Sequence, residues 1–179
     1  MRQRDRTVKL PKVTVKRISS EKELAQAYAI RIRVFVKEQV VPPEIELDDD
    51  DRKALHFIAT VGARAVGTAR VVSRRGAAKI GRMAVLKRYR RRGVGAKLLR
   101  RAIAAARRMR ARKIYLHAQV AVAGFYQRMN FLGVGPVFDE AGIAHRKMIL
   151  REPTLVGTSG SKLPVKKQQL SKAKRFSLV

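Results

Sequence analysis

A glycine-containing loop is the part of the chain whose composition points most directly to chemistry. It reads Arg-Arg-Arg-Gly-Val-Gly over residues 90–95, after an apolar run and before a long amphipathic segment. Gly93 and Gly95 let the backbone approach a ligand without a Cβ in the way, and the first amides of a helix lack partners within it. The positive end of the helix dipole lies at the same place. The loop therefore predicts a pyrophosphate-binding site, although ordinary turns also use a G-x-G sequence.

Few other side chains are candidates for acid, base or metal chemistry. The chain has no cysteine, and its three histidines, at positions 56, 117 and 145, match no metal-binding spacing. We therefore expect no bound metal. His56 and His117 are interpreted as core or edge-strand residues. The acidic run at 48–51 is interpreted as a solvated loop, with attraction of a cationic substrate as the alternative.

Strand and helix patterns place the glycine loop inside a single α/β domain. Strand-like alternation begins at Val13, and Ser20 with Glu23 forms a capping box that predicts a helix reaching about Val36. The pair Pro42-Pro43 forbids its continuation. Further strands are expected over residues 55–61, 65–72, 79–86, 114–118, 131–137 and 147–150, and helices from the glycine loop to Met109 and over 121–129. The strand, helix and strand around the loop predict a parallel crossover.

The charge of the chain is strongly positive and unevenly distributed. The net charge is +29, from 42 Lys and Arg against 13 Asp and Glu. Six acids lie within residues 44–51, and none lies within residues 52–138, which contain 22 Lys and Arg. Such a field attracts polyanions. It predicts weak polyanion binding, with an ordinary solvated basic surface as the alternative.

The ends of the chain differ from its centre in composition. Residues 1–12 are interpreted as a basic N-terminal arm, 13–152 as one domain and 153–179 as a basic, disordered tail. No apolar run approaches the length of a membrane span, and the N-terminus lacks a signal-peptide pattern. We expect a cytoplasmic protein without membrane contact. Monomer and homodimer both stay open.

Several segments together resemble the GNAT superfamily of N-acetyltransferases, and in particular its ElaA-like subgroup. Arg90, Gly93 and Gly95 match the family's motif A, and residues 123–131, Ala-Gly-Phe-Tyr-Gln-Arg-Met-Asn-Phe, are similar to motif B. Residues 31–39, 117–119 and 140–145 resemble the ElaA-like subgroup, so the resemblance covers roughly residues 13–150. In two places the sequence departs from the family pattern. Asn130 replaces a Gly at a left-handed helix cap, which Asn tolerates, and Val40 replaces a Gly in the substrate-side loop.

The resemblance implies a fold, a cofactor and a reaction. The fold would be a twisted mixed sheet flanked by helices, whose fourth and fifth strands splay apart to admit the pantetheine arm of acetyl-CoA. The reaction would be direct acetyl transfer to a primary amine of a small molecule or protein. The backbone of Met83 and Val85 would pair with pantetheine, and the Val85 amide would polarise the thioester carbonyl. The expected cofactor-binding residues are Met83, Ala84, Val85, Arg90, Arg91, Arg92, Gly93, Val94, Gly95, Ala96, Gln119, Phe125 and Tyr126.

The resemblance also implies a proton donor, but it leaves the proton acceptor open. Tyr126 matches the family tyrosine that protonates the departing CoA thiolate, and a phenol of pKa about 10 is neutral at pH 7. Core packing is the alternative for Tyr126, and it suits Phe125 as well. The candidate bases are Glu38, Glu140, His145 and water, with Glu38 near the expected acceptor cleft.

A competing hypothesis is a catalytically weak GNAT scaffold that binds nucleic acid or the ribosome. The arginine-rich stretch motivates it. Only 6% of the residues are aromatic, and no RNA-stacking motif is present, which weakens this hypothesis.

Overall fold

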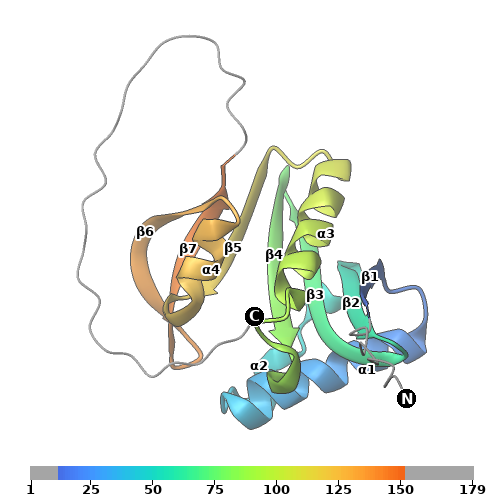
Figure 1. Cartoon of the computed structure of the whole chain (residues 1–179). Helices are drawn as coiled ribbons and strands as arrows, with labels where there is room; N and C mark the ends of the chain where they lie inside the picture. The colour runs from blue at the N-terminus through green and yellow to red at the C-terminus, as the bar shows by residue number, and fades with distance from the viewer. Residues whose placement is uncertain (1–11, 152–179) are drawn as a thin grey trace, which may run out of the picture.

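The computed structural model describes residues 12–151, which fold around one mixed β-sheet. Most of the expected N-terminal arm and the whole expected tail lie outside the described residues. The sheet has seven strands in the order β1-β2-β3-β4-β5-β7-β6. Figure 1 shows that it diverges between β4 and β5 into a larger blade, β1–β4, and a smaller blade, β5–β7. The strands are β1 (Val13–Arg17), β2 (Leu55–Val61), β3 (Arg64–Arg74), β4 (Ala77–Val85), β5 (Lys113–Gln119), β6 (Phe131–Glu140) and β7 (Ile143–Leu150).

Helices cover both faces of the larger blade. These are α1 (Glu21–Arg31), which a π-helix at Ile32–Glu38 follows, and α3 (Val94–Arg108). The short helix α2 (Pro43–Glu46) contacts the π-helix, and α4 (Ala123–Arg128) packs on β5 and β6. Both α1 and α3 contact β3, and seven successive residues of that strand, 66–72, are buried. In a strand, successive side chains point to opposite faces, so both faces of β3 are covered. Within residues 12–151, no helix combines the length and the apolarity that a membrane crossing requires.

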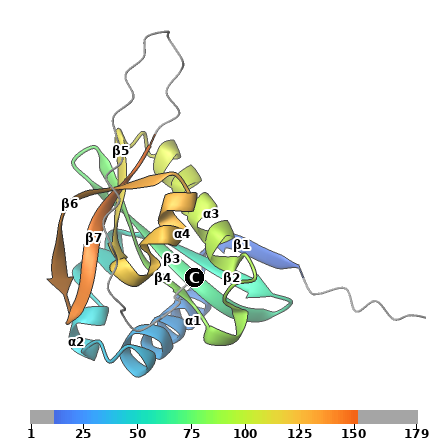
Figure 2. The same cartoon turned by 60° about the vertical axis from the view of Figure 1, so that its left-hand side comes forward.

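The apolar side of α3 fixes the position of the glycine loop. The helix buries most of the apolar residues that its periodicity predicts, with Leu98 and Leu99 fully inaccessible, whereas Met109, just after its end, is exposed. Complete burial of a leucine side chain contributes about 1.5–3 kcal/mol. Since the N-terminus of α3 directly follows the loop, this packing holds the loop against the end of β4 (Figure 2).

The splay between the fourth and fifth strands is present, as the family resemblance implies. β4 and β5 form the parallel pair of the sheet, and their pairing covers only Ala77–Ile80 against Lys113–Leu116. Beyond this point β4 stays with β3, whereas β5 pairs with β7. A β-bulge lies in β4 at the divergence, where Arg82 has a φ of 49°. The bulge adds one residue to β4 and bends it, as bulges generally do.

Three sequence-based boundaries need correction. Strand β6 continues to Glu140, beyond the predicted end at 137, and β7 begins at Ile143, before the predicted start at 147. Their polar half lacks apolar alternation because it is mainly exposed or half-buried, so hydrophobic patterning could not detect it. The first helix is α-helical only to Arg31 and then widens into the π-helix. The capping box is also incomplete: Ser20 accepts from the Glu23 amide, but the Glu23 carboxylate accepts from Ser19.

Val40 occupies a conformation that suits glycine. Its φ is 62°, and its amide and that of Val41 close the end of the π-helix by bonding to Val36 and Phe35 carbonyls. Asn130, the other departure from the family pattern, has a φ of 67° at the end of α4. Asn tolerates this left-handed conformation, but a β-branched residue such as Val40 is strained in it, typically by about 1–3 kcal/mol.

Val40→Gly should therefore stabilise the protein. The side chain of Val40 is 82% exposed, so the substitution removes strain without removing much buried surface. We expect a gain of about 1 kcal/mol in the free energy of unfolding, measured by urea denaturation, because the greater freedom of glycine in the unfolded chain offsets part of the relief. Val40→Ala, which keeps a Cβ, should gain less than the glycine variant. Equal or lower stability of Val40→Gly would show that Val40 is not strained.

Candidate active site

The glycine loop ends in a helix N-terminus with free amides. Gly93 is the N-cap residue, with a φ of 76°, and no side chain caps the helix. The first helical bond runs from the Lys97 amide to the Gly93 carbonyl, so the amides of Val94, Gly95 and Ala96 have no partner within the helix. The first turn contains no acid, and a Cβ added at Gly93 would meet no atom within 4 Å. This end of the helix is open and suited to an anion.

The Arg90 side chain is held by protein groups and is not directed into solvent, where it could bind a phosphate. Its guanidinium forms a fork with Glu38, at 2.5 and 2.7 Å, and its Nε donates to the Val85 carbonyl at 2.8 Å. The interaction ties the π-helix to the end of β4. Arg91 and Arg92, by contrast, are exposed beside the glycines. Arg90 therefore shapes the loop, whereas its two neighbours are free to meet a charged ligand.

The backbone of Val85 faces the gap between β4 and β5. The Leu86 amide donates to the Val66 carbonyl at 2.9 Å, so Leu86 forms the hydrogen-bonded pair with β3. Polar groups alternate along an antiparallel strand, so the amide of Val85 points away from β3. The Val85 carbonyl, which accepts from Arg90, points the same way. Ala84 is paired with Thr68 and buried, so its side chain contributes packing.

Tyr126 lies at the gap with its hydroxyl near Met83. The side chain is 7% exposed, and its hydroxyl contacts the Met83 sulfur at 3.9 Å. Its ring packs edge-on against Phe125 and Phe131, at centroid distances of 4.9 and 6.1 Å. Burial raises the pKa of Tyr126 well above its ordinary value, because the phenolate would be poorly solvated. The hydroxyl therefore keeps its proton at neutral pH. Phe125 is half-buried and supports this ring.

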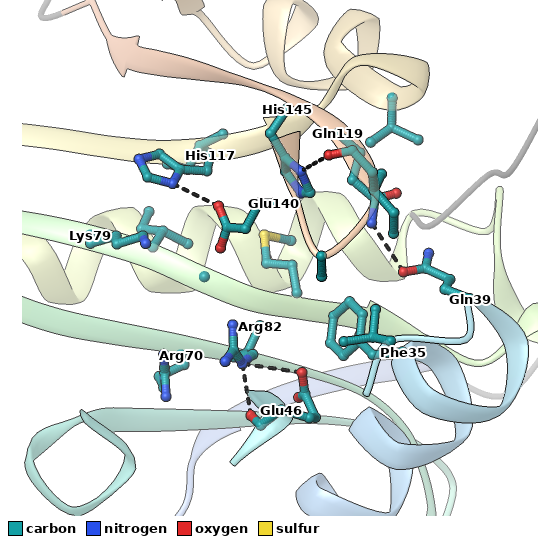
Figure 3. Close-up of a pocket in the computed structure, with 18 of the residues that line it drawn as sticks. Phe35, Gln39, Glu46, Arg70, Lys79, Arg82, His117, Gln119, Glu140 and His145 are labelled. Atoms are coloured by element: carbon teal, nitrogen blue, oxygen red, sulfur yellow. Dashed lines mark hydrogen bonds and ion pairs between the residues drawn. The ribbon is translucent and has the colours of Figure 1, made fainter. Parts of the chain in front are cut away.

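A cavity of about 310 Å³ lies at the divergence of the two strands. Met83 and Tyr126 line it on one side, and Gln119 at the end of β5 lies opposite Gln39, to which it donates a hydrogen bond of 3.0 Å. Figure 3 shows a second group of polar residues in the cavity, drawn from β4, β5 and the β6–β7 hairpin, in which His145 lies beside Gln119. This group consists of Lys79, His117, Glu140 and His145.

The acidic run beside the cavity is not simply a solvated loop, which corrects the interpretation from sequence. Asp51 is buried and accepts hydrogen bonds from Arg31 at 2.7 Å and Arg70 at 2.8 Å. Arg31 is 1% exposed and also binds Glu46 at 2.6 Å. Asp48 binds Arg70 and Arg82. Asp49 is exposed. The run thus neutralises buried arginines behind the cavity wall.

Replacement of Asp51 should destabilise the protein in a pH-dependent way. Burial opposes ionisation of Asp51, but hydrogen bonds from Arg31 and Arg70 outweigh it and lower its pKa from 3.8 to about 2. A lowered folded-state pKa gives stability that is complete above the unfolded pKa and is lost as the pH falls through the folded pKa. Asp51→Asn should lose about 3 kcal/mol of unfolding free energy at pH 7, and the difference from wild type should shrink between pH 4 and pH 2. Asp49→Asn is the matched control. A difference that is constant over this range would contradict the pairing.

The structure separates the candidate bases. Glu38 is held by Arg90 and does not line the cavity, although the neighbouring Gln39 does. Glu140 and His145 both line the cavity. His56 is buried and bonds to the Asp51 carbonyl, as expected for a core histidine. His117, for which the sequence favours a core or edge-strand position, also lines the cavity.

Sequence reasoning missed several cavity residues. Nothing local in the sequence distinguishes Lys79, Arg70, Arg82 and Glu46 from other charged residues of a basic chain. One signal was available. The concentration of acids at 44–51 in a chain with none at 52–138 implies arginine partners for that cluster.

The residues present fit a phosphorylated thioester such as an acyl-CoA. The open N-terminus of α3 and the exposed Arg91 and Arg92 suit its phosphates. The gap beside β4 offers the outward-facing backbone of Val85 to an extended chain. Along the chain, Val85 lies between Met83, which lines the cavity, and the glycine loop.

Comparison with known proteins agrees with this geometry. A sequence model of the Acetyltransferase (GNAT) domain matches residues 15–152. YjcF of Bacillus subtilis strain 168, an uncharacterized N-acetyltransferase, is 34% identical over 131 residues, which are 73% of this chain and 94% of YjcF. Escherichia coli ElaA has a TM-score of 0.70 at 25% identity and covers 78% of this chain and 100% of its own. An acyl-CoA N-acyltransferase from Pseudomonas aeruginosa has a TM-score of 0.68 at 30% identity, covering 79% and 99%. The chain is therefore an acyltransferase that belongs to the GNAT acetyltransferase family.

Proposed function

We propose that this enzyme transfers the acetyl group of acetyl-CoA directly to a primary amine of a small molecule or protein. The observation that carries the proposal is the cavity at the splay of β4 and β5. It brings Tyr126, whose protonated hydroxyl supports a donor role, and the end of β4 together with a separate polar end formed by β5 and the β6–β7 hairpin. A donor and an acceptor could enter from different sides and meet at this point.

The glycine loop and β4 would hold the donor. Amides of Val94, Gly95 and Ala96 would bind its pyrophosphate, with Arg91 and Arg92 adding charge, and Arg90 would keep the loop in shape. The bound thioester supplies an acyl group that is activated toward an amine. The Val85 amide would donate a hydrogen bond to the acyl oxygen as negative charge develops there, which is typically worth a few kcal/mol.

Tyr126 would supply the proton that the departing sulfur needs. Its hydroxyl lies next to the Met83 side chain, which borders the cavity. A phenol of pKa about 10 keeps its proton at neutral pH, so Tyr126 would have a proton to donate to the sulfur as the C–S bond breaks. Phe125 and Phe131 hold the ring in place.

The family match does not support the alternative of a nucleic-acid or ribosome-binding module. The experiment that tests the proposal separates the two. Calorimetric titration of the full chain with acetyl-CoA and with RNA, each at two salt concentrations, is followed by a screen of acetyl-CoA consumption over an amine panel. We expect saturable acetyl-CoA binding and consumption with at least one primary amine. RNA binding without acetyl-CoA binding would overturn the proposal.

A further inference from the structure

A histidine and a carboxylate form a pair in the cavity that the reaction described above does not use. His117 Nδ1 lies 3.0 Å from Glu140 Oε2 (Figure 3). His117 is on β5, just past the last residue that pairs with β4, and Glu140 is the last residue of β6. Both line the cavity with Tyr126. The β6–β7 hairpin thus places the Glu140 carboxylate in the cavity where β4 and β5 diverge.

The hydrogen bond determines which nitrogen of His117 can accept a proton. An ionised carboxylate can only accept, so Nδ1 carries the hydrogen and Nε2 keeps its lone pair. Within residues 12–151, no hydrogen bond engages Nε2 of His117. Phe138 packs edge-on against the ring at 4.9 Å and Tyr115 lies at 6.1 Å, so neighbouring rings limit its rotation.

The surroundings keep the pair in the protonation states that a base requires. Burial lowers the pKa of His117 below 6.5, and the hydrogen bond to Glu140 only partly opposes this effect. Burial disfavours ionisation of Glu140, but the hydrogen bond from His117 and the Lys79 ammonium together lower its pKa. At pH 7 His117 is mainly neutral and Glu140 is charged. The charged or titratable groups that face this part of the cavity are Glu46 of α2, Arg70 of β3, Lys79 and Arg82 of β4, Glu140 of β6, and His145 of β7, while Lys147 of β7 lies opposite His117 in the sheet.

We propose that His117 is the catalytic base that deprotonates the acceptor amine, and that Glu140 is its positioning residue. The proposal rests on the function proposed above. An N–H bond of the acceptor's ammonium breaks, its electron pair stays on the nitrogen as the nucleophilic lone pair, and the proton moves to Nε2 of His117. The Glu140 carboxylate stabilises the imidazolium, which returns its proton to solvent after turnover. A base is needed because an alkylammonium of pKa about 10.4 is only about one part in a few thousand neutral at pH 7.

The other candidates fit the role less well. Glu38 is occupied by Arg90 outside the cavity lining. His145 lines the cavity, but its Nδ1 bonds to the Ile143 carbonyl at 2.7 Å, and a neutral carbonyl stabilises an imidazolium less than a carboxylate does. The carboxylate of Glu140 is already hydrogen-bonded to His117, so it would act on the acceptor through His117 and not directly. The pair joins β5 and β6, which α4 separates in the sequence and β7 separates in the sheet.

The first test reads the protonation of His117 without any substrate. Nitrogen-15 NMR of the full chain, with His117→Gln used to assign the signal, should show hydrogen on Nδ1 and none on Nε2 at neutral pH, with a titration midpoint below 6.5. Glu140→Gln should shift that midpoint downward, because it removes the charge that stabilises the imidazolium. Hydrogen on Nε2 at neutral pH, or a midpoint unmoved by Glu140→Gln, would overturn the proposal.

The second test follows turnover with the amine found in the panel. His117→Gln should lower kcat at pH 7 by about 10²-fold to 10⁴-fold and leave the Kd for acetyl-CoA within about threefold. The wild-type rate should fall as the pH drops through the pKa of His117, because only the neutral imidazole accepts a proton. The variant should lose this limb and recover as the pH approaches the pKa of the amine.

Controls distinguish a lost base from a lost fold or a wrong substrate. Lys113→Gln, at the exposed start of the same strand, should keep the wild-type rate and pH profile. Glu140→Gln should lower kcat less than His117→Gln does, because the base remains. A rate within threefold of wild type for His117→Gln, with the same pH profile, would remove the base assignment and leave amine acetylation intact. Absence of acetyl transfer by the wild type would instead refute the proposed function, while the NMR result still decides the state of the pair.

Discussion

Tyr126→Phe is expected to fold and bind acetyl-CoA like the wild type but to turn over about 10²-fold to 10⁴-fold more slowly, a loss of about 3–5 kcal/mol of transition-state stabilisation. The reason is the environment of the hydroxyl. It is buried, its pKa is raised by burial, and its described contact is a weak one with the Met83 sulfur. Removing it therefore costs little stability. The ring contacts with Phe125 and Phe131 remain.

Single-turnover acetyl transfer at saturating amine is the measurement that checks this prediction, because it isolates chemistry from product release. The Kd for acetyl-CoA should stay within about threefold of wild type. Tyr89→Phe provides a control, since Tyr89 is a half-buried tyrosine near the glycine loop that does not line the cavity. If Tyr126→Phe transferred acetyl within about threefold of wild type, Tyr126 would not be the proton donor.

Gly95→Glu is expected to weaken acetyl-CoA binding by about 100-fold or more. Gly95 is a buried residue in the first turn of α3, and its amide is one of those without a helical partner. A carboxylate about 6 Å from a phosphate charge costs about 3 kcal/mol at an effective dielectric constant of about 20, which corresponds to roughly 100-fold in Kd. Isothermal titration calorimetry measures the change directly.

Gly95→Gln separates charge from bulk. It has nearly the same size as Glu but no charge, so it should retain more affinity than Gly95→Glu. Melting temperatures of both variants must be compared, because any side chain at a buried glycine can disturb packing. Unaltered acetyl-CoA affinity in a folded Gly95→Glu variant would remove the phosphate-binding role of the loop.

Local patterns predicted the elements that hold the donor side of the site. The periodicity of α3, the glycines before it and the strand that precedes them are contiguous in sequence, so spacing alone placed them. The family resemblance added the splay, which the short pairing of β4 with β5 confirms. The left-handed conformation of Asn130 was also anticipated, because Asn tolerates it.

The acceptor side could not be predicted in the same way. It is built from residues far apart in sequence, such as His117 with Glu140, and periodicity carries no information about such contacts. The π-helix after α1 is a further example. Its last residue, Glu38, does not line the cavity, whereas Gln39 directly after it does.

The measurement that tests the account most directly is a single-turnover reaction with acetyl-CoA labelled in its acetyl group, in the presence of the amine that the panel identifies. The account predicts that the label appears on the amine nitrogen in one step, in proportion to the enzyme that carried acetyl-CoA. It also predicts that the enzyme incubated without amine gains no covalent acetyl group by intact-mass spectrometry. Label retained on the enzyme, or no labelled amine despite saturable acetyl-CoA binding, would contradict direct transfer at the splay of β4 and β5.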